Sequence, residues 1–323
     1  MVANGFFILF WDLVLIAAGI AILIKASDIT VDAASTIAKS IGVSELLIGL
    51  SVTSIGTSIP EIATTTTASL AHARGVAAAA GVGIGNIVGS NITQITLILG
   101  AAALFKSLDI QKKALLRDGL MMLLASVLLI LALSDGVVTN VEGMILATIY
   151  IAYLYFIFKS ETMSGEKREL ESKYKTVGVL IIGLAGVVLG AKLLVDSSIT
   201  IAEHFGISSS IIGLTIVAVG TSLPELAVSV TAAIKGMSGL SIGNLIGSNI
   251  TDPLFSMGIA ASVNSKGLPV DPAILKYDAP ILIGVIVLAL YLMGTEWRLS
   301  RREGALLVVV YLFYLYVNFV IKV

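Results

Sequence analysis

Two copies of one short motif lie inside long apolar runs, and together they restrict what this chain can fold into. The first copy is Gly56-Thr57-Ser58-Ile59-Pro60-Glu61, and the second is Gly220-Thr221-Ser222-Leu223-Pro224-Glu225. An acid embedded in a membrane costs about 3 kcal/mol on insertion scales, so it marks a functional site by default. A proline has no N–H and breaks or kinks a helix. Each motif therefore predicts a broken, membrane-embedded helix that carries a functional acid.

The composition is that of a membrane protein. Of 323 residues, 57% are hydrophobic and only 13% are charged, whereas soluble domains average about 25% charged residues. The mean hydropathy is +1.02. The net charge of −1 argues against a nucleic-acid partner, which needs a basic surface. The chain has no cysteine, so a disulfide framework and a thiolate metal site are excluded.

Apolar runs predict an all-α membrane protein with ten transmembrane helices. A spanning helix needs about 20 apolar residues. The predicted spans are 5–24 (continuing through a more polar segment to 38), 44–71, 83–105, 114–134, 141–158, 176–203, 208–234, 240–262, 279–294 and 304–321. Spans two and seven are expected to be broken, at Pro60 and Pro224. The polar stretch 159–175 is predicted to link a first unit, 1–158, to a second, 176–323.

The two halves repeat each other. Besides the first motif, Gly-Asn-x-x-Gly-Ser-Asn occurs at 85–91 and again at 243–249. Two such repeats in register indicate an internal duplication. Each half holds five spans, an odd number, so the second half should enter the membrane upside down. Inverted repeats with broken helices at matching positions are typical of secondary transporters, whose site lies between the repeats at mid-membrane.

Basic residues predict the orientation. The connections after odd-numbered spans hold fourteen Lys and Arg: Lys39, Lys106, Lys112, Lys113, Arg117, Lys159, Lys167, Arg168, Lys173, Lys175, Lys235, Arg298, Arg301 and Arg302. The other side holds four: Arg74, Lys266, Lys276 and Lys322. The side rich in basic residues is expected to be cytoplasmic. Both termini are then extracellular and the 159–175 linker is cytoplasmic.

The candidate site is built from oxygen ligands. Residues four apart share a helix face, and four such pairs carry oxygens: Thr57 with Glu61, Thr221 with Glu225, Ser90 with Gln94, and Ser248 with Asp252. The predicted ligands of one cation are Glu61, Glu225, the carbonyls near Thr57 and Thr221, and as further candidates Asp252, Gln94, Ser58 and Ser222. Calcium takes six to eight oxygens in flexible geometry. Zinc and copper are disfavoured because no nitrogen or sulfur ligand is near.

Other interpretations of these residues explain less. A buried pair of glutamates with a purely structural role leaves the repeated Pro, Thr and Ser unexplained. A calcium channel usually needs a pore among several subunits. A hydrolase needs a nucleophile with a nearby base, and the Ser and Thr here lack a neighbouring His or Lys, so no enzymatic activity is expected. Asn86 and Asn244 are candidate ligands, but we favour a role in holding the broken helices by hydrogen bonds. We also expect Lys192 to pair with Asp196, and Lys25 with Asp28 or Asp32.

At these two motifs the chain resembles the calcium/cation antiporter superfamily, most closely its sodium/calcium exchanger branch, over nearly its whole length. The resemblance implies exchange of Ca²⁺ for monovalent cations across a cell membrane by alternating access. It implies that Glu61 and Glu225 bind calcium together with the backbone carbonyls of Thr57 and Thr221. It also implies sodium-site roles for four serines and matches the family's acidic position on the eighth span to Asp252. The four serines are Ser58, Ser222, Ser90 and Ser248.

One departure leaves the counter-ion open. Gln94 stands where many sodium/calcium exchangers have Asn, and the longer amide can occlude or reshape a sodium position. Low dielectric favours the neutral form of a carboxyl, so protons are an alternative to sodium. The expected partners are the bilayer, Ca²⁺ and either Na⁺ or H⁺. No cofactor is expected, and the sequence is silent on oligomeric state.

Overall fold

The computed structural model describes residues 2–76, 79–112, 115–160, 173–205 and 218–321. Within these ranges the regular secondary structure is helical apart from four two-residue strands, which confirms the predicted all-α membrane fold. In the described part of the chain, six helices are long and apolar enough to cross a membrane, and a bent pair, 45–57 with 59–73, makes a seventh span. Most of the predicted linker, 159–175, and the start of the predicted span 208–234 lie outside the described residues.

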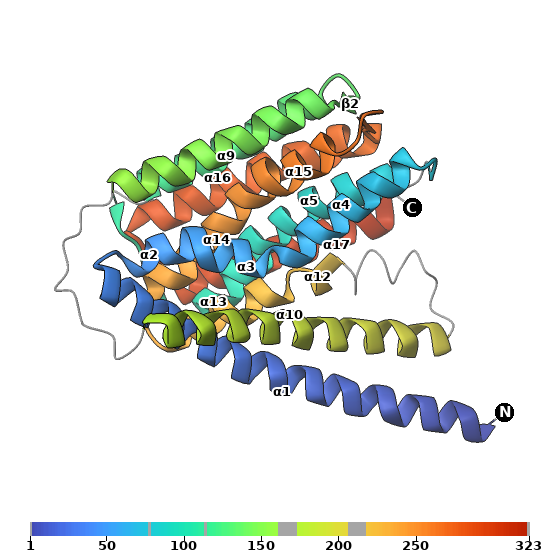
Figure 1. The fold of residues 1–323 in the computed structure, drawn as a ribbon, viewed down its shortest axis with the longest axis horizontal. Coiled ribbons are helices and arrows are strands. Elements are labelled where there is room, and N and C mark those ends of the chain that lie inside the picture. Colours follow the sequence, from blue (N-terminus) through green and yellow to red (C-terminus); the bar gives the residue numbers. More distant parts are fainter. Residues whose placement is uncertain (1, 77–78, 113–114, 161–172, 206–217, 322–323) are drawn as a thin grey trace.

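Each half is a run of helices (Figure 1). Short π-helical turns, here given the label η, interrupt these helices. The first half comprises α1 (Val2–Ile41), α2 (Glu45–Ile48), η1 (Gly49–Thr53), α3 (Ser54–Thr57), α4 (Ile59–Ala73), α5 (Ala79–Thr93), η2 (Gln94–Ile98), α6 (Leu99–Phe105), β1 (Leu108–Asp109), η3 (Leu115–Gly119), α8 (Leu120–Leu133), β2 (Val137–Val138) and α9 (Asn140–Ser160).

The described elements of the second half follow the same order. They are α10 (Lys173–His204), α12 (Ala218–Gly220), α13 (Leu223–Ile234), α14 (Ser238–Thr251), η5 (Asp252–Ser256), α15 (Met257–Ser262), β3 (Leu268–Pro269), η6 (Ile274–Asp278), α16 (Ala279–Thr295), β4 (Arg298–Leu299) and α17 (Arg301–Ile321).

The helix of the first motif breaks before its proline. The axis bends by 46° between residues 45–57 and 59–73, and the non-helical residue between them is Ser58, with φ −78° and ψ 7°. The predicted break at Pro60 is therefore two residues too late. Pro60 lies in the first turn of α4, where its missing N–H has no intrahelical partner to lose. Ser222 and Pro224 repeat this arrangement at the start of α13.

The strand pairs show that the two halves are inverted. In the duplicated order, β1 is equivalent to β3, since they follow the equivalent helices α6 and α15. Likewise β2 is equivalent to β4, since they follow α8 and α16. In space, however, β1 pairs with β4 and β2 pairs with β3. Equivalent connections therefore lie at opposite ends of the bundle, which confirms the inverted repeat.

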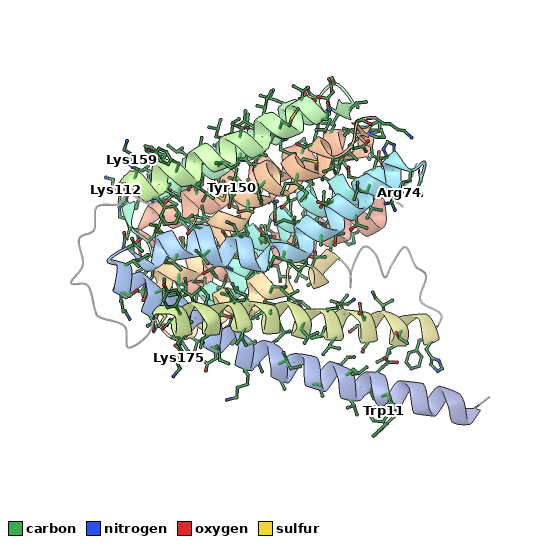
Figure 2. The ribbon with its side chains drawn as sticks, in the orientation of Figure 1. Trp11, Arg74, Lys112, Tyr150, Lys159 and Lys175 are labelled. Carbon is green, nitrogen blue, oxygen red and sulfur yellow. The ribbon has the colours of Figure 1, made fainter. Side chains whose placement is uncertain are left out.

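Basic side chains gather at one end of the bundle. Figure 2 shows Lys112, Lys159 and Lys175 at that end and Arg74 at the opposite end. This separation agrees with the division of basic residues that the sequence predicts.

The long helices α1 and α10 lie side by side along one face of the bundle (Figure 1). Their glycines allow this close approach: a Cβ added at Gly19 would lie 2.8 Å from the backbone oxygen of Gly190. Small residues at helix interfaces commonly serve this purpose in membranes.

Ion pairs near this face differ in part from expectation. Lys192 bonds Asp196 at 2.7 Å, as predicted. The predicted partner of Asp28 and Asp32 is wrong, because Lys235, just beyond α13, bonds both carboxylates at 2.6 Å. The pairing joins α1 to the other half, so it depends on packing between helices that are distant in sequence.

Close packing of α14 predicts a stability difference between two glycines. A methyl group at Gly243 would lie 2.5 Å from the backbone oxygen of Leu46, so we expect Gly243→Ala to lower the free energy of unfolding by about 1–3 kcal/mol. Gly284 on α16 has open space within 4 Å, so Gly284→Ala should be neutral or stabilise by up to about 1 kcal/mol. Thermal unfolding of the detergent-solubilised proteins measures both. Equal midpoints for the two variants would contradict this account of the α14 packing.

Candidate cation-binding site

The two motif acids are fully buried at the restart of broken helices. Glu61 lies in the first turn of α4 and Glu225 in the first turn of α13, and both are 0% exposed. The first turn of a helix has free N–H groups and the positive end of the helix dipole, which stabilise a carboxylate. The breaks at Ser58 and Ser222 therefore create the setting that allows an acid to remain inside the bundle.

Each acid is hydrogen-bonded by the other half of the molecule. Ser58 Oγ donates to Glu225 Oε1 at 3.2 Å, and Ser222 Oγ donates to Glu61 Oε1 at 3.3 Å. Glu225 and Asp252 lie near enough to Glu61 for negative charges on these carboxylates to repel one another. The inverted repeat thus brings the acids of both halves to one centre.

Among the described residues, the second oxygen of each glutamate has no hydrogen-bond partner. Within those same ranges, Glu61 Oε2, Glu225 Oε2 and Ser248 Oγ are buried side-chain atoms without a hydrogen bond. Buried polar atoms are normally satisfied, so each exception needs an explanation. Across the described ranges, no three His, Cys, Asp or Glu side chains converge on metal-ligating geometry. The available donors are therefore two glutamates with hydroxyl and carbonyl oxygens, a set suited to a hard cation.

The motif threonines are engaged by asparagines of the opposite half. Thr57 Oγ1 donates to Asn244 Oδ1 at 3.2 Å, and Thr221 Oγ1 donates to Asn86 Oδ1 at 3.5 Å. The expected role of the two asparagines in holding the broken helices is confirmed by these bonds.

Each asparagine is held in turn by a hydroxyl that sequence reasoning missed. Asn244 Nδ2 donates to Ser229 Oγ at 3.0 Å, and Asn86 Nδ2 donates to Thr65 Oγ1 at 3.1 Å. Ser229 and Thr65 each follow a motif glutamate by four residues. That spacing on one helix face is the signal that could have found them.

Asp252 lies beside the glutamates within a set of donors. Gln94 Nε2 donates to its Oδ2 at 3.1 Å, and Ser90 Oγ reaches the same atom at 3.5 Å. Ser256 Oγ donates to Oδ1 at 3.2 Å, a contact that sequence reasoning missed. The π-helical turns η2 and η5 begin at Gln94 and Asp252. Such turns are frequent at functional sites because they re-aim side chains.

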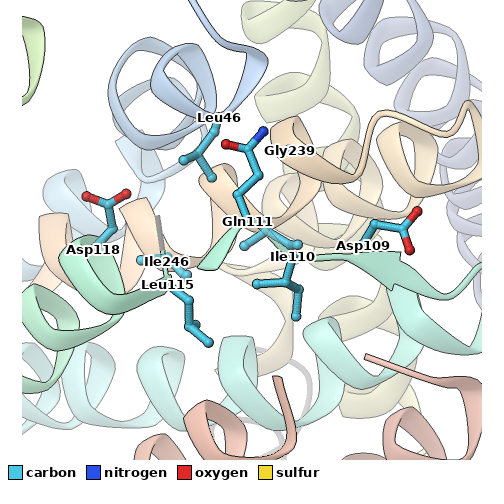
Figure 3. Close-up of a pocket in the computed structure, with 9 residues that line it drawn as sticks. Leu46, Asp109, Ile110, Gln111, Leu115, Asp118, Gly239 and Ile246 are labelled. Carbon is cyan, nitrogen blue, oxygen red and sulfur yellow. The ribbon is translucent and has the colours of Figure 1, made fainter. Parts of the chain in front are cut away.

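Figure 3 shows a separate hollow in the structure. It is lined by Leu46, Asp109, Ile110, Gln111, Leu115, Asp118, Gly239, Ile242 and Ile246. Asp118 is already bound by Arg117 at 2.7 Å and by the Tyr153 hydroxyl at 3.0 Å. None of the predicted ligands lines this hollow, so it is distinct from the carboxylate centre.

An inverted repeat with a polar centre held between its two broken helices defines a multi-pass membrane transporter. The model of the sodium/calcium exchanger protein family matches residues 11–159 and 175–320. The chain therefore belongs to the sodium/calcium exchanger family, which is a family of transporters and not of enzymes.

Several relatives match nearly the whole of the chain. The sodium/calcium exchanger MaX1 of Methanosarcina acetivorans is 35% identical, over 94% of this chain and 97% of its own length. The inner membrane protein YrbG of Escherichia coli is 32% identical, over 90% of each chain. Among solved structures, the sodium-calcium exchanger NCX_Mj superposes with a TM-score of 0.82 at 32% identity, covering 94% of this chain and 98% of that one.

Proposed function

We propose that this protein is a secondary antiporter that moves Ca²⁺ across the membrane in exchange for a monovalent cation, Na⁺ or H⁺, by alternating access. The single observation that carries the proposal is a pair of fully buried oxygens, Glu61 Oε2 and Glu225 Oε2, that have no hydrogen-bond partner in the part of the chain that the structure describes. Two ionised glutamates balance the charge of one calcium ion. A buried charge is tolerated only when it is paired, so a pocket loaded with either ion can close and an empty one cannot.

The remaining predicted ligands complete the proposed pocket. The backbone carbonyls of Thr57 and Thr221 supply further oxygens for Ca²⁺. The hydroxyls of Ser58, Ser222, Ser90 and Ser248 supply oxygens for the counter-ion, and Asp252 and Gln94 border it. The names of MaX1 and NCX_Mj as sodium/calcium exchangers support Na⁺ as the counter-ion. The hydrogen bond from Gln94 to Asp252 supports H⁺ as the alternative, because it takes up an oxygen that a sodium ion would need.

We further propose the orientation and units of the chain in the membrane. The lysine-rich end of the bundle faces the cytoplasm, in accord with the distribution of basic residues in membrane proteins. The termini are then extracellular, and residues 159–175 form a cytoplasmic linker between units 1–158 and 176–323.

Flux through proteoliposomes tests the function. Vesicles containing the purified protein should take up ⁴⁵Ca²⁺ when an outward Na⁺ gradient is imposed with pH clamped, or when an outward H⁺ gradient is imposed without Na⁺. The gradient that drives uptake identifies the counter-ion. Uptake that proceeds equally without either gradient would indicate a channel and contradict the proposal, and so would no uptake under either gradient.

A further inference from the structure

A chain of buried amide hydrogen bonds joins the two halves beside Asp252. Asn249 Nδ2 donates to the backbone oxygen of Leu245 at 3.0 Å and to Gln94 Oε1 at 2.8 Å. Gln94 Nε2 donates in turn to Asp252 Oδ2 at 3.1 Å. The side chains of Asn249, Gln94 and Asp252 are all 0% exposed.

The direction of this chain is determined by its two ends. The backbone oxygen of Leu245 can only accept, so the Asn249 atom that contacts it must be the NH₂ group. An ionised carboxylate at Asp252 also only accepts, so the Gln94 NH₂ group must face it. The Gln94 oxygen then faces Asn249, and no other arrangement of the two amides satisfies both ends.

We propose that Asn249 is a positioning residue that sets ion selectivity, by holding the Gln94 N–H on Asp252 in the place where a monovalent cation would otherwise bind. The proposal rests on the antiporter function proposed above. A cation and an N–H group compete for the same carboxylate oxygen. The Gln94 oxygen, which would be needed to complete a cation site at Asp252, is turned away because Asn249 uses it.

Asp252 differs from Glu61 and Glu225 in how its carboxylate oxygens are hydrogen-bonded, and the proposed role of Asn249 requires this difference. Asp252 receives donors on both oxygens, from Ser256 on Oδ1 and from Gln94 on Oδ2. Glu61 and Glu225 each keep one buried oxygen without a hydrogen-bond partner among the residues that the structure describes. The glutamates are therefore open to Ca²⁺, while Asp252 is occupied by the protein's own amide.

The duplication supplies a matched control residue. Asn91 is the equivalent of Asn249 in the first half, is also 0% exposed, and donates to the backbone oxygen of Ile87 at 2.8 Å. Its substitution removes the same kind of bond within a helix but leaves Gln94 in place.

The experiment measures displacement of ⁴⁵Ca²⁺ from the purified, detergent-solubilised full chain by added Na⁺ at fixed pH. In Asn249→Ala the Gln94 amide is free to turn its oxygen toward Asp252. We therefore expect half-displacement at an Na⁺ concentration about tenfold lower than in the wild type, the scale of one charge-assisted hydrogen bond. Asn91→Ala should stay within about twofold of the wild type. Gln94→Asn, which is too short to reach both partners, should reproduce the Asn249→Ala shift and replaces it if that variant does not fold.

The outcomes separate the two proposals. A wild-type chain that does not bind Ca²⁺ overturns the antiporter function and this inference together. A wild-type chain that binds Ca²⁺, with Asn249→Ala unchanged or with Asn91→Ala shifted equally, overturns only the role of Asn249.

Discussion

Replacing Glu61 or Glu225 with glutamine should reduce Ca²⁺ uptake by roughly 100-fold or more, because each variant removes one of the two charges that balance the ion and one strong oxygen ligand. Glutamine keeps the size of the side chain and an oxygen that can accept the cross-repeat serine bond, so the fold should survive. The measurements are ⁴⁵Ca²⁺ uptake in proteoliposomes and stabilisation of the solubilised protein by Ca²⁺, which should be lost in both variants.

A second pair of symmetry-related acids serves as the control. Glu142 and Glu303 cap the N-termini of α9 and α17 by accepting from the backbone N–H groups of Thr139 at 2.8 Å and Ser300 at 2.7 Å. Glu142→Gln and Glu303→Gln should leave uptake within about twofold and lower stability by about 1 kcal/mol at most. Uptake at the wild-type rate in both Glu61→Gln and Glu225→Gln would show that the motif acids are not the ligands.

Asp118→Ala should produce the largest loss of stability, about 3–5 kcal/mol, because it removes a buried carboxylate that accepts hydrogen bonds from a guanidinium and from a phenol. Asp118 is 0% exposed and binds the Arg117 guanidinium through two bonds of 2.7 and 2.9 Å. It also accepts from the Tyr153 hydroxyl at 3.0 Å. The midpoint of thermal unfolding in detergent measures the loss.

Tyr153→Phe measures how much of this loss of stability comes from the hydrogen bond of the Tyr153 hydroxyl to Asp118. It removes one hydrogen bond and leaves the ion pair intact, so it should cost only about 1 kcal/mol. If Asp118→Ala destabilised the protein no more than Tyr153→Phe, the ion pair would contribute nothing to the stability of the bundle.

The general architecture of this protein could be predicted from sequence because membrane insertion depends on local composition. A run of apolar residues long enough to cross lipid must form a helix, since no water is available to satisfy its backbone. The odd number of spans in each repeat then requires inversion. The candidate ligands could be predicted from sequence for the same reason. Glu61 and Glu225 stand out because an acid inside a membrane is costly.

The position of the helix break and the identity of the bonding partners were decided only by the tertiary structure. The break falls at Ser58 because a helix can begin with proline in its first turn, a choice that the composition around Pro60 leaves open. Asp28 and Asp32 form ion pairs with Lys235 and not with Lys25, which is closer in sequence, because packing places α13 against α1.

The same holds for the bonds that connect the two halves. Ser58 bonds Glu225, and Asn249 turns Gln94 toward Asp252, across 155 or more residues of chain. Hydropathy and motif spacing describe each helix on its own axis, so they identify residues that belong inside the membrane. They carry no information on which face of one helix meets which face of another, and that relation decides the donor and acceptor at every atom of the site.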